Sequence, residues 1–299
     1  MTSLSPIGTP PTGRRQLVDG RHYFIDRSGT DGPPVIFLPG AGAMALDYWN
    51  LHGPTAALAT SVLYDRGGTG WSDPVALPRT MAEVTDELRR ILGVVGLDPP
   101  FVLVGHSLGG GYARHYAQRF PREVAGLLLL DPLHEDGNRH FPRRVVEMQE
   151  AMKSQPMAEL PPGMIEAYRA AFVQKFAAWP AEIRDPLIEQ HLRAWRTGIV
   201  EGSNVDGLYQ ELRQGGPLPD VPVIVMTALA IDPMQRQFME EEDLRGINAA
   251  KLIMNRGVVA SVDRGEHREL PAATHVWLHL DDSAAVVQAI ADLLGRIEA

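Results

Sequence analysis

The chain has 299 residues, of which 44% are hydrophobic and 22% charged, and its formal net charge at pH 7 is -9. This composition supports a globular core and excludes a fully disordered chain or a coiled coil. The negative charge argues against nucleic acid or an anionic membrane as a partner. The absence of cysteine excludes disulfides, thiol catalysis and Cys-ligated metals. The sequence shows no apolar stretch of membrane-spanning length and no secretory signal, so we expect a cytoplasmic protein.

The first 130 residues alternate between short apolar runs and amphipathic segments. Residues 1–13 are expected to form a loose tail, and a hairpin is predicted at 16–26 with its turn at Asp19-Gly20. Nearly continuous apolar runs follow, which is typical of parallel strands covered on both faces; they occupy residues 35–38, 61–64, 101–104 and 126–130. Helices are predicted between them at 43–58, 80–95 and 108–120. The second of these begins with Thr80 and Glu83, which are spaced as a capping box, and carries one apolar stripe of Met81, Val84, Leu88, Ile91 and Leu92. The alternation predicts an α/β fold with a doubly wound, mostly parallel sheet.

The alternation stops after Asp131, and residues 133–219 are predicted to contain only helices. Strand patterns return at 221–227 and 266–270, and a last amphipathic helix is predicted at 283–297. The simplest organisation is a core domain of residues 1–132 and 220–299 that carries a helical cap, residues 133–219.

Aromatic residues recur at helical spacing inside this predicted cap. Tyr168, Phe172 and Phe176 are four residues apart, and Met148 and Met152 are similarly spaced. They either roof an apolar pocket or pack the cap onto itself and the core, and the sequence leaves both interpretations open.

The segment Gly105-His106-Ser107-Leu108-Gly109 lies between a predicted strand and a predicted helix. A serine in a sharp strand-to-helix turn has strained backbone angles, and side chains two residues away on either side would collide. Glycine at both positions removes the collision. Such a turn exposes the Ser107 hydroxyl near the N-terminus of the helix, where negative charge is stabilised.

A second glycine-rich turn lies upstream, at Gly40-Ala41-Gly42. It follows a predicted strand, and Asp65 comes about 25 residues later. This arrangement fits a loose dinucleotide-binding pattern, although Pro39 before the first glycine argues against it.

Together these segments are similar to the α/β-hydrolase fold superfamily. The resemblance rests on FLPGAG, LYDRGGTGWSD, FVLVGHSLGGGYARHYAQRFPREVAGLLLLDP, GEHRELPAATH and HLDDSAAVVQAI. It covers residues 15–132 and 221–297. FLPGAG resembles the oxyanion loop of the family, with Pro39 where a histidine is usual.

The resemblance implies a Ser, Asp, His triad in chain order. Ser107 would be the nucleophile and His275 the base, with His279 as the alternative base. Asp232 is the favoured acid because it follows the strand at 221–227, and Asp131 is the alternative. No metal and no organic cofactor is implied.

The N–H groups of Ala41 and Leu108 would form the oxyanion hole. The expected activity is that of a carboxylesterase-like or lactonase-like serine hydrolase. Its substrate would be a small ester, lactone or related acyl compound with a hydrophobic acyl or aromatic part. A monomer or homodimer is expected. Two alternatives remain on the same scaffold: a slow ligand-binding receptor, and a lyase or perhydrolase that uses the same Ser and His.

Overall fold

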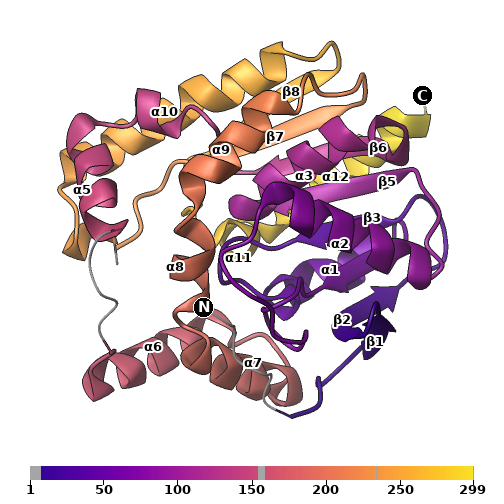
Figure 1. The fold of residues 1–299 in the computed structure, drawn as a ribbon, viewed down its shortest axis with the longest axis horizontal. Coiled ribbons are helices and arrows are strands. Elements are labelled where there is room, and N and C mark those ends of the chain that lie inside the picture. The colour runs from indigo at the N-terminus through magenta and orange to yellow at the C-terminus, as the bar shows by residue number, and fades with distance from the viewer. Residues whose placement is uncertain (1–7, 154–158, 234, 299) are drawn as a thin grey trace.

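The computed structural model describes residues 8–153, 159–233 and 235–298. Its centre is an eight-stranded sheet in the order β1-β2-β4-β3-β5-β6-β7-β8 (Figure 1). β2 is antiparallel to both of its neighbours, and the remaining pairs are parallel. The strands are β1 (Arg14–Val18), β2 (Arg21–Ser28), β3 (Val35–Leu38), β4 (Ser61–Tyr64), β5 (Phe101–His106), β6 (Val124–Leu130), β7 (Val223–Ala228) and β8 (Gly265–Leu270). The predicted mostly parallel sheet is confirmed.

The predicted hairpin is confirmed as the pair β1 and β2. Its two-residue turn has positive φ at both positions, 48° at Asp19 and 80° at Gly20. This backbone matches the right-handed twist of the flanking strands. The part of the predicted tail at residues 1–7 lies outside the described residues.

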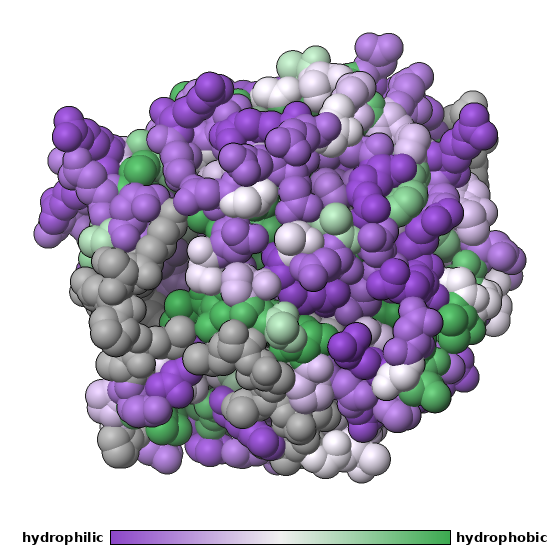
Figure 2. Space-filling model, viewed as in Figure 1, coloured by the Kyte–Doolittle hydropathy of each residue, from purple (hydrophilic) through white to green (hydrophobic). Residues whose placement is uncertain are grey.

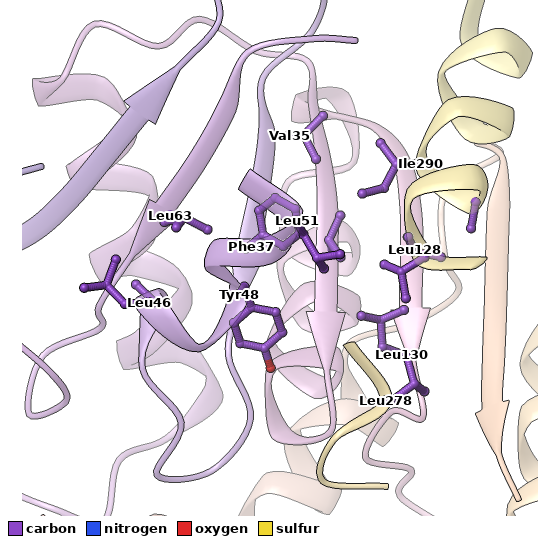
Figure 3. Packing of buried hydrophobic residues seen from close by; sticks show 14 of the residues in the cluster. Val35, Phe37, Leu46, Tyr48, Leu51, Leu63, Leu128, Leu130, Leu278 and Ile290 are labelled. Carbon is purple, nitrogen blue, oxygen red and sulfur yellow. The ribbon is translucent and has the colours of Figure 1, made fainter. Parts of the chain in front are cut away.

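Helices cover both faces of the sheet, which explains why the strands lack polar alternation. On one face, Phe37 and Leu128 pack with Leu51 of α1 (Trp49–Ala56) and Ile290 of α12 (Ser283–Glu298) (Figure 3). The 3-10 helix η1 (Ala45–Tyr48) leads into α1.

The opposite face is buried by different residues of the same strands. Ile36, Leu103 and Leu129 belong to a second apolar cluster, to which several helices contribute. These helices are α2 (Met81–Val94), α3 (Leu108–Arg119), α9 (Val205–Gln214) and α10 (Glu241–Ala260). Successive strand residues therefore enter two separate cores.

The start of α2 is fixed by the predicted capping box. Thr80 Oγ1 accepts a hydrogen bond of 3.1 Å from the Glu83 N–H, and Glu83 Oε2 accepts one of 2.8 Å from the Thr80 N–H. The predicted apolar stripe of the helix is buried; it consists of Met81, Val84, Leu88, Ile91 and Leu92.

Residues 133–219, the insert, form helices in the part that the structure describes. After α4 (Gly137–His140) and α5 (Arg143–Lys153) come α6 (Pro162–Lys175), α7 (Ala181–Arg193), α8 (Thr197–Gly202) and α9. α9 belongs to the layer on the sheet, because Leu208 and Leu212 are buried in the second cluster. Its Glu211 also accepts hydrogen bonds from the Met81 and Ala82 N–H groups at the start of α2. That the insert forms a separate cap stays a prediction.

Aromatic residues join α6 and α7 to the core. Phe172 and Phe176 stack on His191 with ring centroids 4.8 and 6.1 Å apart, and His191 Nε2 lies 2.7 Å from Asp47 Oδ1 of η1. Trp179 Nε1 donates to the Leu46 carbonyl at 3.0 Å. Phe172 and Phe176 therefore pack the insert onto the core, which is the second of the two interpretations left open by the sequence. Tyr168 is half-buried. The Met152 side chain lies outside the described residues.

The helix α10 was not predicted from the sequence. This 20-residue helix links β7 to β8, and such a connection is required because adjacent parallel strands need a crossover. Within the described residues, no helix is both long and apolar enough to span a bilayer.

Candidate active site

The turn that carries Ser107 connects β5 to α3. Ser107 has φ 52° and ψ -118°, a left-handed φ that is rare for a residue other than glycine. The two flanking glycines are needed on steric grounds. A Cβ at Gly109 would lie 1.9 Å from the Leu38 carbonyl oxygen, and one at Gly105 would lie 2.5 Å from the Gly109 oxygen. The backbone has the sharp turn that the sequence predicted.

Ser107, His275 and Asp131 form a hydrogen-bonded chain of side chains. His275 Nε2 lies 3.1 Å from Ser107 Oγ, and His275 Nδ1 lies 2.6 Å from Asp131 Oδ2. Because a carboxylate only accepts, Nδ1 carries the proton and Nε2 is the acceptor for the serine hydroxyl. Asp131 is fully buried, whereas the His275 side chain is 33% exposed. The structure thus brings together Ser107 and His275, as the sequence suggested.

The acid that contacts His275 is Asp131, which corrects the preference for Asp232. The register of β5 and β6 pairs His106 with Leu130, so the next residues, Ser107 and Asp131, leave neighbouring strands at the same level. The Ser107 N–H donates to the Leu130 carbonyl at 3.0 Å, which continues this pairing into the turn. Asp232 lies four residues beyond the end of β7, and its carbonyl accepts the Gln235 N–H at the start of η3 (Gln235–Gln237).

Lys251 on α10 also contacts the buried carboxylate. Its Nζ lies 2.7 Å from Asp131 Oδ2 and 2.6 Å from the Ala228 carbonyl oxygen. Burial raises the pKa of Asp131, but the Lys251 cation and the hydrogen bond from His275 outweigh it, so the pKa lies below its usual range. Asp131 is therefore ionised at neutral pH. Lys251 was not predicted as a site residue, because the helix that carries it was not predicted from the sequence.

His106 holds the loop that bears His275. His106 Nε2 donates to the His275 carbonyl at 2.7 Å, so Nδ1 must be the acceptor for the Tyr48 hydroxyl, also at 2.7 Å. Burial lowers the pKa of His106 to about 4, so the ring is neutral. Its side chain therefore points into the structure, where both ring nitrogens are hydrogen-bonded.

His279, the alternative base, is a core residue. Its ring stacks on Tyr48 with centroids 4.3 Å apart, and burial lowers its pKa well below the usual value. Neither ring nitrogen has a hydrogen-bond partner among the described residues. His275 is therefore the histidine that the structure places at Ser107.

The loop with Ala41 lies against the Ser107 turn. A Cβ on Gly40 would lie 3.4 Å from Ser107 Cβ, and Leu108 is the first residue of α3. Among the described residues, no acceptor is found for the N–H of Ala41 or Leu108. The role of these two groups as an oxyanion hole stays a prediction.

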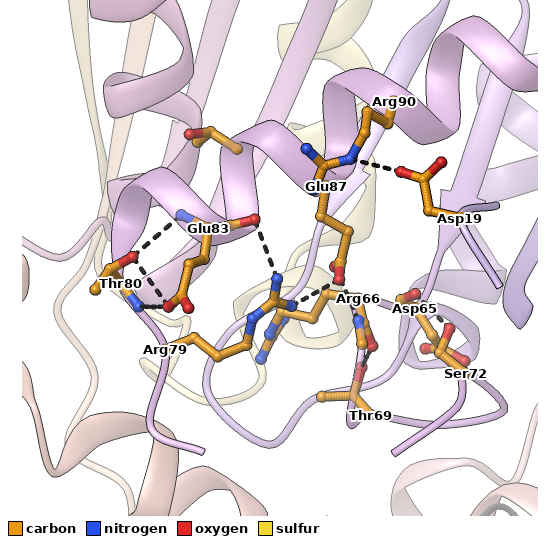
Figure 4. A network of polar contacts seen from close by, with 12 residues as sticks. Asp19, Asp65, Arg66, Thr69, Ser72, Arg79, Thr80, Glu83, Glu87 and Arg90 are labelled. Carbon is orange, nitrogen blue, oxygen red and sulfur yellow. Dashed lines mark hydrogen bonds and ion pairs between the residues drawn. The ribbon is translucent and has the colours of Figure 1, made fainter. Parts of the chain in front are cut away.

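The Asp65 side chain is hydrogen-bonded to backbone N–H groups near it. Its two carboxylate oxygens accept the N–H groups of Ala45, at 2.7 Å, and Trp71, at 2.9 Å, and its carbonyl accepts the Ser72 hydroxyl (Figure 4). A fully buried carboxylate with both oxygens engaged is not available to a ribose, which removes support from the dinucleotide interpretation. No cluster of three or more His, Asp or Glu side chains suited to a metal occurs in the described ranges.

The fold and this geometry agree with the comparisons to known proteins. The alpha/beta hydrolase family matches residues 35–289, so the chain belongs to the alpha/beta hydrolase family. Among curated relatives, the uncharacterized protein YbdG of Bacillus subtilis is 28% identical over 38% of this chain and 36% of its own length. Lipase LipV of Mycobacterium tuberculosis is 33% identical over 60% of this chain and 63% of its own length. The chain therefore matches less than two thirds of either relative.

Solved structures share the fold over nearly the whole chain. A thermophilic esterase from Thermogutta terrifontis superposes with a TM-score of 0.60 and 19% identity, covering 95% of this chain and 97% of the esterase. A mutant epoxide hydrolase from Vigna radiata gives a TM-score of 0.67 and 16% identity, covering 95% and 98%. At these identities the likeness concerns the fold alone.

Proposed function

We propose that the protein is a serine hydrolase that cleaves small acyl compounds, esters or lactones, through an acyl-enzyme intermediate. The observation that carries the proposal is the chain from Ser107 Oγ to His275 Nε2 and from His275 Nδ1 to Asp131. This order of hydroxyl, imidazole and buried carboxylate is what an activated serine nucleophile requires.

The mechanism follows from the protonation states. Ser107 attacks the acyl carbonyl while His275 Nε2 takes its proton, and ionised Asp131 stabilises the resulting imidazolium. The N–H groups of Ala41 and Leu108 donate to the oxygen that becomes negative. His275 then returns the proton to the leaving group, and water cleaves the acyl-enzyme by the same proton path in reverse. Losing one oxyanion donor typically lowers the rate by about 10²–10³.

The exposed hydrophobic residues next to the site favour an apolar acyl or aromatic substrate. Val276, which follows His275, is 42% exposed, and Ile199, which follows a glycine packed on the Ala41 loop, is 51% exposed. Figure 2 shows a patch of hydrophobic surface in the lower half of the displayed face, with polar surface above it. The similarity to LipV, which is named a lipase, agrees with an acyl substrate.

A serine nucleophile argues against epoxide or haloalkane chemistry, for which the fold uses aspartate at this turn. We further propose that the protein is a cytoplasmic monomer or homodimer. Its negative net charge favours a small-molecule substrate over nucleic acid or a membrane.

Fluorophosphonate labelling with intact-mass detection tests the nucleophile. The wild type should gain one adduct and Ser107→Ala none, while a series of p-nitrophenyl esters measures the preferred acyl length. Labelling of Ser107 without turnover of any ester would favour the receptor or lyase alternative. An unlabelled Ser107 at high reagent concentration, in protein whose fold is confirmed by circular dichroism, would overturn the proposal.

A further inference from the structure

The insert reaches the Ala41 loop through Glu201 on α8. Glu201 Oε2 accepts the Gly42 N–H at 2.7 Å, directly after Ala41. The same carboxylate forms a double hydrogen bond with Arg66, from Nε at 2.5 Å and from Nη2 at 2.6 Å. Both side chains are buried, with exposed fractions of 1% for Arg66 and 4% for Glu201. The two residues are 135 positions apart in the chain.

Arg66 also hydrogen-bonds to the residues that precede Ala41 in the oxyanion loop. Its Nη1 donates to the Pro39 carbonyl at 2.9 Å, and its Nη2 donates to the Gly40 carbonyl at 2.6 Å. Carbonyl groups and a glycine N–H on both sides of Ala41 are therefore held by one buried ion pair. A guanidinium presents its donors in a fixed planar fork, so it fixes orientation as well as distance.

Gly198, one turn earlier on α8, packs on the same loop. A Cβ on Gly198 would lie 3.1 Å from the Ala41 carbonyl oxygen and 3.2 Å from Gly42 Cα. In the reverse direction, a Cβ on Gly42 would lie 2.9 Å from the nitrogen and Cα of Gly198. The backbone of α8 is therefore in direct contact with the peptide between Ala41 and Gly42.

From these contacts we infer that Gly198 and Glu201, together with Arg66, are positioning residues for the oxyanion loop. The position of α8 fixes where the Ala41 N–H lies relative to Ser107, so Gly198, Glu201 and Arg66 contribute to transition-state stabilisation without touching the substrate. The inference rests on the proposed function, because it assigns Ala41 to the oxyanion hole. The contact between Glu201 and the Gly42 N–H can be tested independently of any reaction.

Gly198→Ala is the mildest test, because it adds one methyl group and changes no charge. The new Cβ must displace the Ala41–Gly42 peptide by a few tenths of an ångström. We expect the second-order rate of fluorophosphonate labelling and kcat to fall at least about tenfold, with KM changed less than about threefold, because the oxyanion contact is made in the transition state.

Gly202→Ala is the matched control on the same helix. A Cβ at Gly202 meets no atom within 4 Å, so labelling and kcat should stay within about twofold of wild type, since a solvent-facing methyl group perturbs little. Equal rates in Gly198→Ala, Gly202→Ala and wild type would overturn the inference.

Glu201→Gln tests the ion pair itself. An amide would oppose its NH₂ group to an N–H of Arg66, so the carboxylate contact is lost. Glu135→Gln is the matched control, because Glu135 forms a comparable double contact with Arg114, at 2.6 and 2.8 Å, away from the loop. Both variants should lower the melting temperature, and only Glu201→Gln should slow the labelling of protein that is still folded.

Hydrogen exchange of the peptide that spans residues 39–44 separates this inference from the proposed function. Glu201→Gln should speed exchange of the Gly42 amide, and Glu135→Gln should leave it unchanged, whether or not Ser107 reacts. Faster exchange in a protein whose wild type does not label would uphold the contact and reject the hydrolase. Unchanged exchange and labelling in Glu201→Gln would reject the positioning role while leaving the hydrolase intact.

Discussion

Asp131 shares a single carboxylate oxygen between His275 and Lys251. Oδ2 accepts from His275 Nδ1 at 2.6 Å and from Lys251 Nζ at 2.7 Å. A cation beside the acid offsets part of the negative charge that would otherwise stabilise an imidazolium. The ion pair also keeps Asp131 ionised in spite of its burial.

Replacing Lys251 by methionine should therefore change the pH dependence of the reaction. Without the cation, less opposes the burial that raises the pKa of Asp131, so Asp131 becomes protonated at higher pH and the acid limb of kcat/KM should move to higher pH. The measurement is kcat/KM between pH 5 and 9. Lys175→Met is the control, because Lys175 pairs with Asp281 rather than with Asp131. An acid limb that stays at its wild-type pH would contradict the shared-charge interpretation.

The two candidate acids can be told apart by isosteric substitution. Asp131→Asn should lower kcat by roughly 10⁴, because an amide at this position favours the wrong imidazole tautomer. Asp232→Asn should stay within about threefold, since no role in the reaction is assigned to it. Steady-state kinetics on a p-nitrophenyl ester that the wild type hydrolyses distinguish them. The reverse result would restore the sequence-based preference for Asp232.

The two candidate bases should respond in opposite ways. His275→Ala should abolish measurable turnover while the protein stays folded. His279→Ala should keep its activity per folded molecule but lose about 2–4 kcal/mol of stability, because it leaves a cavity beneath the stacked Tyr48 ring. Urea unfolding and active-site titration on the same samples measure both effects. An inactive, fully folded His279→Ala would show that the assignment of the base is wrong.

The pair of Arg114 and Glu135 predicts part of the acid sensitivity of the fold. Burial raises the pKa of Glu135, but hydrogen bonds and attraction from Arg114 lower it to about 2 in the folded protein. Because the folded-state pKa is depressed, its stabilising contribution is complete above the unfolded value of 4.5 and is lost as pH falls toward 2. Urea midpoints between pH 6 and 2.5 should therefore fall less steeply in Glu135→Gln than in wild type. Parallel curves would contradict the assignment.

Local patterns predicted the elements whose cause is local. The turn at Asp19-Gly20, the capping box at Thr80 and the glycines around Ser107 depend on neighbours within a few residues, and each lies where it was expected. The preference for Asp232 was wrong because the outcome depends on strand register. Only the pairing of His106 with Leu130 shows that Asp131 and Ser107 emerge side by side.

Contacts between distant segments could not be predicted from the sequence. Arg66 and Glu201 are ordinary charged residues in their own segments, and their pairing follows only when α8 is placed on the oxyanion loop. Lys251 was missed for a related reason, because its contact with Asp131 joins residues that are 120 positions apart in the chain. Long-range packing determines both contacts.

The register of β5 and β6 also has a consequence for how this chain can change. Nucleophile and acid leave adjacent strands at one level, and the Ser107 N–H bonds directly to Leu130, so their separation is set by the sheet ladder. The loop between β7 and α10 therefore does not have to supply the acid. Substitutions and changes of length in this loop, before the helix that carries Lys251, are expected to alter the surroundings of the site while the reacting groups keep their spacing, so specificity can diverge there without loss of chemistry.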